Sequence, residues 1–172
     1  MDILFTSKLF KVVRKFTTGR SGTQLERHII EHPGAVVILP ILPDGRIVLI
    51  KQPRVAVDEE LIELPAGTRE PAEQPLVTAR RELVEETGYT AGEMTEIFRF
   101  YASPGFIKEE MYLFKAEKLV AGPTNLEDGE KITPLIVDLP EAMQMVQTGQ
   151  IRDAKTLIGL LWYNQNGQQK SS

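Results

Sequence analysis

Residues 67–89 concentrate negative charge near the end of a predicted helix. Pro75 suits the first turn, apolar residues follow at helical spacing, and Gly88 supplies a stop, so we expect roughly three to four turns. Carboxylates near a helix C-terminus oppose the macrodipole, and like charges three or four residues apart repel. A helix that tolerates such charge is expected to supply oxygen ligands to a hard divalent cation. The three carboxylates belong to Glu82, Glu85 and Glu86.

Length and composition narrow the class of protein. A chain of 172 residues is long enough for one domain with a sizeable core, or for one domain with a short appendage. No stretch approaches the roughly 18 apolar residues of a membrane span, so we expect a cytoplasmic protein without a membrane partner. The chain has no cysteine, which excludes disulfides and thiolate metal sites. Its net charge of −4 argues against nucleic acid as a partner but allows a small anionic ligand.

The N-terminal segment, residues 1–33, is predicted to form a small antiparallel β-hairpin before the main domain at 34–172. Short apolar runs lie on both sides of a turn-like segment at 18–22, and Pro33-Gly34 marks the boundary. His28 and His32 are four residues apart and could suggest a metal pair. No third ligand is near, and the local pattern is that of a strand, so we favour a structural role for both.

The main domain combines strands with a few helices. Two apolar runs, 35–42 and 46–52, are separated by Asp44-Gly45, which predicts a second hairpin. Two helices near the C-terminus are indicated by Pro140 near the start of one and Asp153 as N-cap of the other. Strands and helices do not alternate regularly, so we expect an α+β or mixed-sheet α/β sandwich. Further strands are predicted at 61–67, 95–103, 111–119 and 132–139.

The central stretch fits the pattern G-x5-E-x7-R-E-U-x-E-E-x-G-U, where U is a bulky apolar or aromatic residue. With seven fixed letters at roughly 7% each, a chance match at any start is on the order of one in 10⁸. The pattern resembles the Nudix box, and the resemblance implies a Nudix fold with a loop–helix–loop motif. The nine matching residues are Gly67, Glu73, Arg81, Glu82, Leu83, Glu85, Glu86, Gly88 and Tyr89.

The resemblance also implies hydrolysis of a nucleoside diphosphate linked to another group, with Mg²⁺ or, in its place, Mn²⁺. A pyrophosphate is already negative, so attack by water is hindered until cations neutralise its oxygens. Arg81 and Glu73 are expected to orient the ligand carboxylates. The alternative is a charged helix that faces solvent, which leaves the complete match unexplained. The implied metal ligands are Glu82, Glu86, Glu85 (directly or through water) and the carbonyl of Ala66.

Outside the box, the chain resembles ADP-ribose pyrophosphatases and related nucleoside-diphosphate-sugar hydrolases. The similarity lies in the ordered segments EHPGAVVILPI, IKQPR, IELPAG and SPGF, the last with Pro104 sixteen residues after Gly88. This branch implies a small-molecule nucleotide-sugar substrate. It also implies a homodimer in which the N-terminal segment helps to build substrate pockets shared by two subunits.

Individual substrate contacts follow from the same resemblance. Arg54, which could otherwise be a solvated residue at a strand end, is expected to contact phosphate or ribose. Glu109 is expected to meet the terminal sugar, and Arg27 is a further contact from the dimer-forming segment. Phe106 is a candidate for stacking on the nucleobase, although aromatic residues of this kind also serve in cores.

The acidic loop 127–130 resembles the mobile catalytic loop of this branch. Glu130 would be a further metal ligand or the general base, and Asp128 is the alternative base; Glu85 is also a catalytic candidate. Such a base needs to come within hydrogen-bond reach of the attacking water, which requires the loop to close.

Two other functions are compatible with the sequence. A Nudix enzyme could act on another nucleotide, such as a dinucleoside polyphosphate or a nucleoside triphosphate. A non-catalytic nucleotide-binding module could use the same scaffold, but such modules typically carry an eroded box and this one is complete. The nucleobase and the sugar are not identified by the residues.

Overall fold

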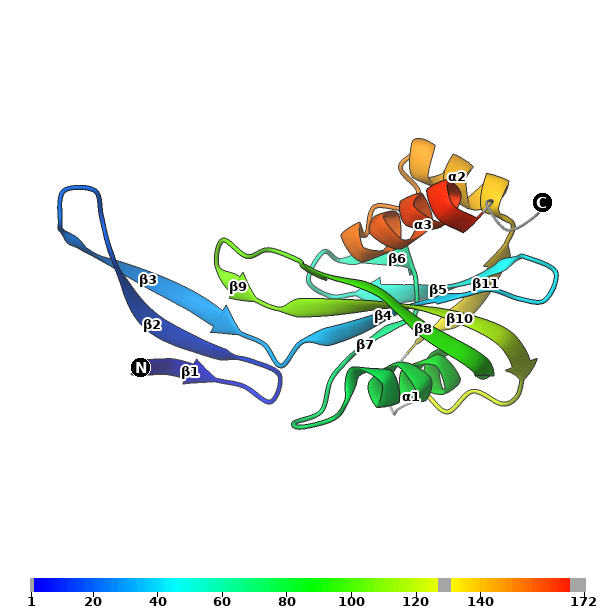
Figure 1. The fold of residues 1–172 in the computed structure, drawn as a ribbon, viewed down its shortest axis with the longest axis horizontal. Coiled ribbons are helices and arrows are strands. Elements are labelled where there is room, and N and C mark those ends of the chain that lie inside the picture. Colours follow the sequence, from blue (N-terminus) through cyan, green and yellow to red (C-terminus); the bar gives the residue numbers. More distant parts are fainter. Residues whose placement is uncertain (1, 127–130, 168–172) are drawn as a thin grey trace.

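The computed structural model describes residues 2–126 and 131–167. Figure 1 shows a body of two sheets between helices, with an N-terminal arm that extends away from it. The arm is a four-stranded sheet in the order β1-β2-β3-β9, antiparallel except for the β3–β9 pair. Its strands are β1 (Asp2–Thr6), β2 (Lys11–Thr18), β3 (Gln24–Glu31) and β9 (Ile107–Lys108).

The body contains a mixed sheet in the order β7-β4-β10-β8 and an antiparallel sheet in the order β11-β5-β6. In the mixed sheet only β4 and β10 run parallel. This arrangement confirms the predicted mixed-sheet sandwich. The strands are β4 (Ala35–Pro40), β5 (Ile47–Arg54), β6 (Glu59–Glu63), β7 (Ala66–Thr68), β8 (Tyr89–Tyr101), β10 (Glu110–Ala121) and β11 (Thr133–Val137).

Helix α1 (Pro75–Thr87) covers one side of the body, and α2 (Leu139–Gln147) with α3 (Ala154–Asn166) covers the other (Figure 1). The predicted helix between Pro75 and Gly88 is confirmed. Gly88 adopts the left-handed conformation, with φ of 74°, and its N–H donates to the carbonyl of Val84. None of the helices formed by the described residues has the length and apolar character needed to cross a membrane.

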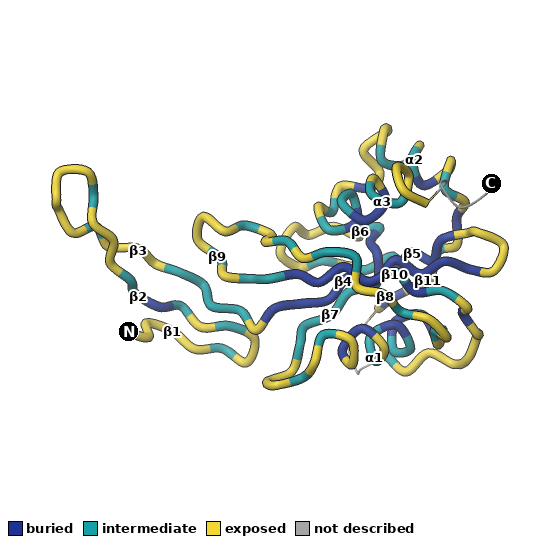
Figure 2. The backbone as a smooth tube through the Cα atoms, viewed as in Figure 1, coloured by how far each residue is buried: buried dark blue, intermediate teal, exposed yellow. Residues whose placement is uncertain are grey.

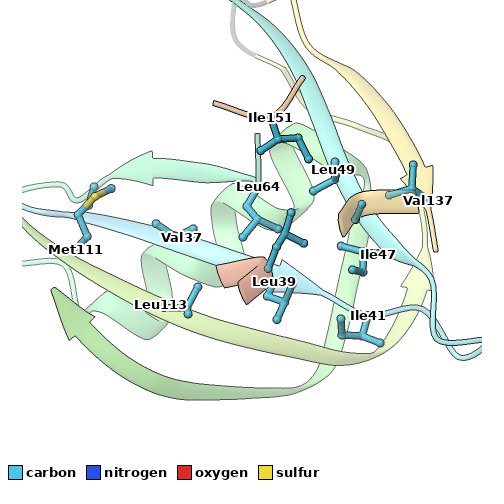
Figure 3. Close-up of a cluster of buried hydrophobic side chains, with 13 residues drawn as sticks. Val37, Leu39, Ile41, Ile47, Leu49, Leu64, Met111, Leu113, Val137 and Ile151 are labelled. Carbon is cyan, nitrogen blue, oxygen red and sulfur yellow. The ribbon is translucent and has the colours of Figure 1, made fainter. Parts of the chain in front are cut away.

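Two clusters of apolar side chains hold these layers together. One lies between the sheets and helices α2 and α3, and includes Leu39, Leu49, Leu64 and Leu113 (Figure 3). The other packs the opposite face of β4 and β10 against α1. Figure 2 shows buried residues concentrated along β4, β10 and the first half of β5, whereas most of the arm is exposed.

The predicted hairpin between the runs at 35–42 and 46–52 is wrong in its pairing. The turn forms, since the N–H of Gly45 donates to the carbonyl of Leu42 at 2.9 Å, and one bridge joins Ile41 to Ile47. Beyond it the strands separate, and β4 pairs with β7 and β10 while β5 pairs with β6 and β11. Every residue of β4 is buried, so long-range partners that cover both of its faces determine its place.

The predicted N-terminal hairpin corresponds to β2 and β3, which pair in register from Lys11 with Glu31 to Thr18 with Gln24. The third arm strand, β1, was not predicted. Strand β9 comes from the middle of the chain and pairs with β3, so the arm sheet continues into the body. The division into 1–33 and 34–172 stays a prediction.

Candidate functional site

The carboxylates of α1 lie directly against β7. A Cβ atom at Gly67 would lie 2.0 Å from Oε1 of Glu82, so any larger residue here would displace the Glu82 carboxylate. The N–H of Ala66 donates to Oε2 of Glu86 at 2.9 Å. Glu86 is only 3% exposed, although it is a carboxylate. The first glycine of the box therefore makes room for one glutamate, and the preceding residue binds another.

Arg81 binds three carboxylates around this site. Its Nη1 donates to Oε1 of Glu82 at 2.8 Å and to Oε2 of Glu85 at 2.9 Å, while Nε and Nη2 reach Glu73. Burial alone would lower the pKa of Arg81, but its pairing with the glutamates raises it. The hydrogen bond from Arg81 in turn lowers the pKa of Glu73. Arg81 thus bridges the three-glutamate helix face and the loop before α1.

The three glutamates border a hollow of about 510 Å³. Within residues 2–126 and 131–167, no three acidic or histidine side chains form a ready-made metal site. Instead, the guanidinium of Arg81 lies between Glu82 and Glu85. The donor chemistry nevertheless fits a hard divalent cation, because the available side-chain donors are carboxylate oxygens on one helix face.

A second hollow, of about 370 Å³, adjoins the first. The two share a wall made by Leu9, Arg54 and residues 66–68. The second hollow extends from this wall toward the N-terminus of α3. Its other lining residues include His32, Tyr101, Glu109, Asp153 and Lys155. Arg54 therefore lines both hollows.

The structure brings six of the predicted site residues together. Arg54 lies in the shared wall, and Glu109 lines the second hollow, where its Oε1 is 3.4 Å from Nδ1 of His32. Thus His32 pairs with a carboxylate, while His28 lies 2.8 Å from Glu26. The remaining four, around the first hollow, are Ala66, Glu82, Glu85 and Glu86.

Two predicted contacts lie elsewhere in the single chain. Phe106 is 52% exposed and lines neither hollow. Arg27 is on β3, where its Nη1 donates to the carbonyl of Glu26 at 2.9 Å. Both stay predictions. The two candidates for the general base, Asp128 and Glu130, lie outside the described residues.

Sequence reasoning missed two charged residues next to Arg54, Glu63 and Lys155. Glu63 is 1% exposed and binds both Arg54 and Lys155. A single acid within the apolar run LIELP is a signal that could have identified Glu63, because an unpaired buried charge is costly. Lys155 carries no such signal, since a lysine in the first turn of a helix is usually solvated.

Comparison with known proteins identifies a family and several relatives. The NUDIX domain model matches residues 31–158. The chain is 37% identical over 159 residues to the ADP-ribose pyrophosphatase of Bacillus subtilis (strain 168), which covers 91% of this chain and 86% of that protein. It is 34% identical to the methanol dehydrogenase activator of Bacillus methanolicus, with the same coverage.

Further relatives include the GDP-mannose pyrophosphatase of Enterobacter sp. (strain 638), 39% identical over 141 residues that cover 77% of this chain and 73% of that protein. A solved structure of an ADP compounds hydrolase superposes with a TM-score of 0.82, covering 96% of this chain and 92% of its own. Its sequence identity of 22% supports the fold alone. Since the domain model spans most of the chain and several relatives exceed 30% identity, the chain belongs to the Nudix family.

Proposed function

We propose that this protein hydrolyses the pyrophosphate bond of ADP-ribose, of other nucleoside diphosphate sugars, or of both. The products are a nucleoside monophosphate and a sugar phosphate. The main support for this activity is the position of the three glutamates. They border one of two adjoining hollows, and Arg54 lines both. This arrangement suits a substrate with a central pyrophosphate and two bulky ends. Relatives named ADP-ribose pyrophosphatase and GDP-mannose pyrophosphatase support the same substrate class.

Nudix pyrophosphatases generally use a divalent metal ion. We infer that here the ion is Mg²⁺, with Mn²⁺ able to substitute, and that Glu82, Glu86, Glu85 and the carbonyl of Ala66 hold it. When bound, it supplies positive charge to the pyrophosphate oxygens and lowers the pKa of water. Arg81 contributes by holding Glu82 and Glu85 at a fixed spacing while Glu73 holds Arg81.

The other residues bind the substrate and move a proton. The guanidinium of Arg54 binds phosphate oxygen at the shared wall, and the carboxylate of Glu109 accepts hydrogen bonds from the terminal sugar. Water attacks one phosphorus, the bond from that phosphorus to the bridging oxygen breaks, and the leaving phosphate keeps the electron pair. A carboxylate takes the proton of the attacking water. Glu130, Asp128 and Glu85 are the candidates.

We further propose a cytoplasmic homodimer formed through the N-terminal arm. Large apolar side chains are exposed there, an arrangement that a second copy would cover. Arg27 would then contact substrate across the subunit boundary. The exposed apolar residues of the arm are Ile3, Leu4, Phe5, Leu9 and Phe16.

A substrate panel with Mg²⁺ tests the proposed activity. ADP-ribose, GDP-mannose, UDP-glucose, diadenosine polyphosphates and deoxynucleoside triphosphates are incubated with the protein, and the products are separated by ion-exchange chromatography. We expect nucleoside monophosphate and sugar phosphate from ADP-ribose or the nucleotide sugars. Turnover confined to dinucleoside polyphosphates or triphosphates would contradict the proposed substrate class. No turnover of any compound would contradict the proposed enzymatic activity.

A further inference from the structure

The side chain of Glu63 joins three elements that are distant in sequence. Glu63 ends β6, Arg54 ends β5, and Lys155 lies in the first turn of α3. Oε1 of Glu63 accepts a hydrogen bond from Nε of Arg54 at 2.7 Å, and Oε2 accepts one from Nη2 at 2.7 Å. Oε2 also pairs with Nζ of Lys155. The two-point contact with Arg54 fixes the plane of the guanidinium as well as its distance.

Charge and burial show that this cluster stays ionised. Burial alone would raise the pKa of Glu63, but the hydrogen bonds from Arg54 and the charge of Lys155 outweigh it, and the net shift is downward. The hydrogen bond with Glu63 raises the pKa of Arg54. A carboxylate that is 1% exposed and charged, with two cations around it, holds those cations in place, because losing either would leave a buried charge under-compensated.

Helix α3 is itself fixed next to Glu63. Oγ1 of Thr156 accepts a hydrogen bond from the N–H of Leu64 at 2.8 Å and donates one to Oδ2 of Asp153 at 2.6 Å. Oδ1 of Asp153 lies 2.9 Å from Nζ of Lys155. The ammonium group therefore has two carboxylate neighbours, and the start of α3 cannot shift without breaking a buried backbone contact.

Glu63 lines neither hollow, whereas Arg54 lines both. The two-point contact with Glu63 uses Nε and Nη2 of Arg54, and Nη1 takes no part in it. We propose that Glu63 is a positioning residue: its buried carboxylate, balanced by Lys155, orients Arg54 in the shared wall so that Arg54 binds a phosphate group of the substrate. This role rests on the proposed function, and it assigns to Glu63 no contact with the substrate.

The test compares binding of ADP-ribose to Glu63→Gln, Arg54→Met and the double variant by calorimetry in EDTA, which prevents turnover. Glu63→Gln keeps the volume of the side chain but removes its charge. We expect each single variant to weaken binding about tenfold, and the double variant to stay within about twofold of Arg54→Met, since coupled residues are not additive. With Mg²⁺, KM of Glu63→Gln should rise about tenfold while kcat changes less than about threefold.

Glu59→Gln is the matched control. Glu59 lies on the same strand and pairs with Arg152, but its side chain is 47% exposed and it lines neither hollow. This variant loses the same charge and should bind ADP-ribose like the wild type. A merely structural Glu63 would instead weaken binding by a factor that multiplies with that of Arg54→Met in the double variant.

Three results would overturn the positioning role. They are wild-type affinity in Glu63→Gln, a double variant whose loss of affinity equals the product of the two single losses, and no binding of ADP-ribose by the wild type. If the variants bind ADP-ribose as expected but the wild type does not hydrolyse it, the positioning role is retained and only the proposed function is refuted. If Glu63→Gln does not fold, Glu63→Asp replaces it, because the shorter side chain keeps the charge and leaves Arg54 unchanged but cannot reach Nε and Nη2 of Arg54 from the same position. We expect several-fold weaker binding there, and unchanged affinity would overturn the proposal.

Discussion

The absence of a side chain at Gly67 allows Glu82 to lie against β7. An alanine Cβ would lie 1.9 Å from Cδ of Glu82, far inside van der Waals contact, so the carboxylate would have to move. We expect Gly67→Ala to lower the free energy of unfolding by about 1–3 kcal/mol, as overpacking does. It should also lower kcat/KM for ADP-ribose at least about tenfold, since misplacement by 1 Å is that costly. Urea unfolding and initial rates measure the two effects.

Gly105 provides the control for that substitution. A Cβ atom there meets nothing within 4 Å, and its φ is not in the left-handed region. Gly105→Ala should change the free energy of unfolding by less than about 0.5 kcal/mol. Equal stability of the two alanine variants would contradict the close approach of Glu82.

Glu86 allows charge to be separated from packing. Glutamine can still accept the hydrogen bond from Ala66 through its amide oxygen, so the fold should persist. Loss of the carboxylate charge should lower kcat about 10²-fold or more, as expected for a group that supports transition-state charge. Glu96→Gln, an exposed position on β8 paired with Arg99, should keep full activity. Near wild-type turnover in Glu86→Gln, with its melting temperature unchanged, would refute the metal assignment.

The lowered pKa of Glu63 predicts how stability depends on pH. A carboxyl group whose pKa is depressed in the folded state adds stability above its unfolded pKa, near 4.5, and that contribution disappears as pH falls through the folded value. The difference in unfolding free energy between wild type and Glu63→Gln should therefore be complete above about pH 5.5 and shrink below 4.5. Urea unfolding at pH 7, 5.5 and 3.5 measures it, and a constant difference would argue against this sign.

At the level of elements, the placement of α3 depends on a buried threonine. Thr156 is completely buried, and Thr156→Val would leave the N–H of Leu64 without its acceptor. We expect a loss of about 1–3 kcal/mol in the free energy of unfolding, the usual cost of an unsatisfied buried donor. Thr148→Val, at the exposed end of α2, removes a hydroxyl that donates to the carbonyl of Gln144 and should cost much less. Similar losses of unfolding free energy in the two variants, measured by chemical denaturation, would contradict the stabilising role of the hydrogen bond between Leu64 and Thr156.

For the whole molecule, the exposed arm predicts self-association. Phe16 is 60% exposed on β2, and a serine there should weaken a dimer formed through the arm. By sedimentation velocity at micromolar concentration, we expect a dimeric wild type and a shift toward monomer in Phe16→Ser. Val120→Ser, which removes an apolar side chain 65% exposed at the end of β10, should remain dimeric. A monomeric wild type would refute the homodimer.

Local signals account for what could be predicted. Pro75 and Gly88 delimit α1, Asp153 caps α3, and the spacing of the glutamates places them on one helix face, because each of these depends on a few neighbouring residues. The partners of β4 and β5 were not predictable in this way. β4 and the first half of β5 are apolar runs, and such a run indicates that a strand is buried but not which distant strand covers it.

The sequence by itself determined the chemistry: residues 67–89 specify a helix that carries three carboxylates, and the pattern assigns the chain to the Nudix family, which the comparisons confirm. Only the tertiary structure decided which distant residues surround the three carboxylates and Arg54. It placed Glu82 on Gly67, paired Arg81 with Glu85, and joined Arg54 to Glu63 and Lys155 across three elements. The physical reason is the distance along the chain over which each interaction acts. Helix periodicity and caps act within a few residues, whereas the pairing of buried charges depends on which distant segments the core brings together.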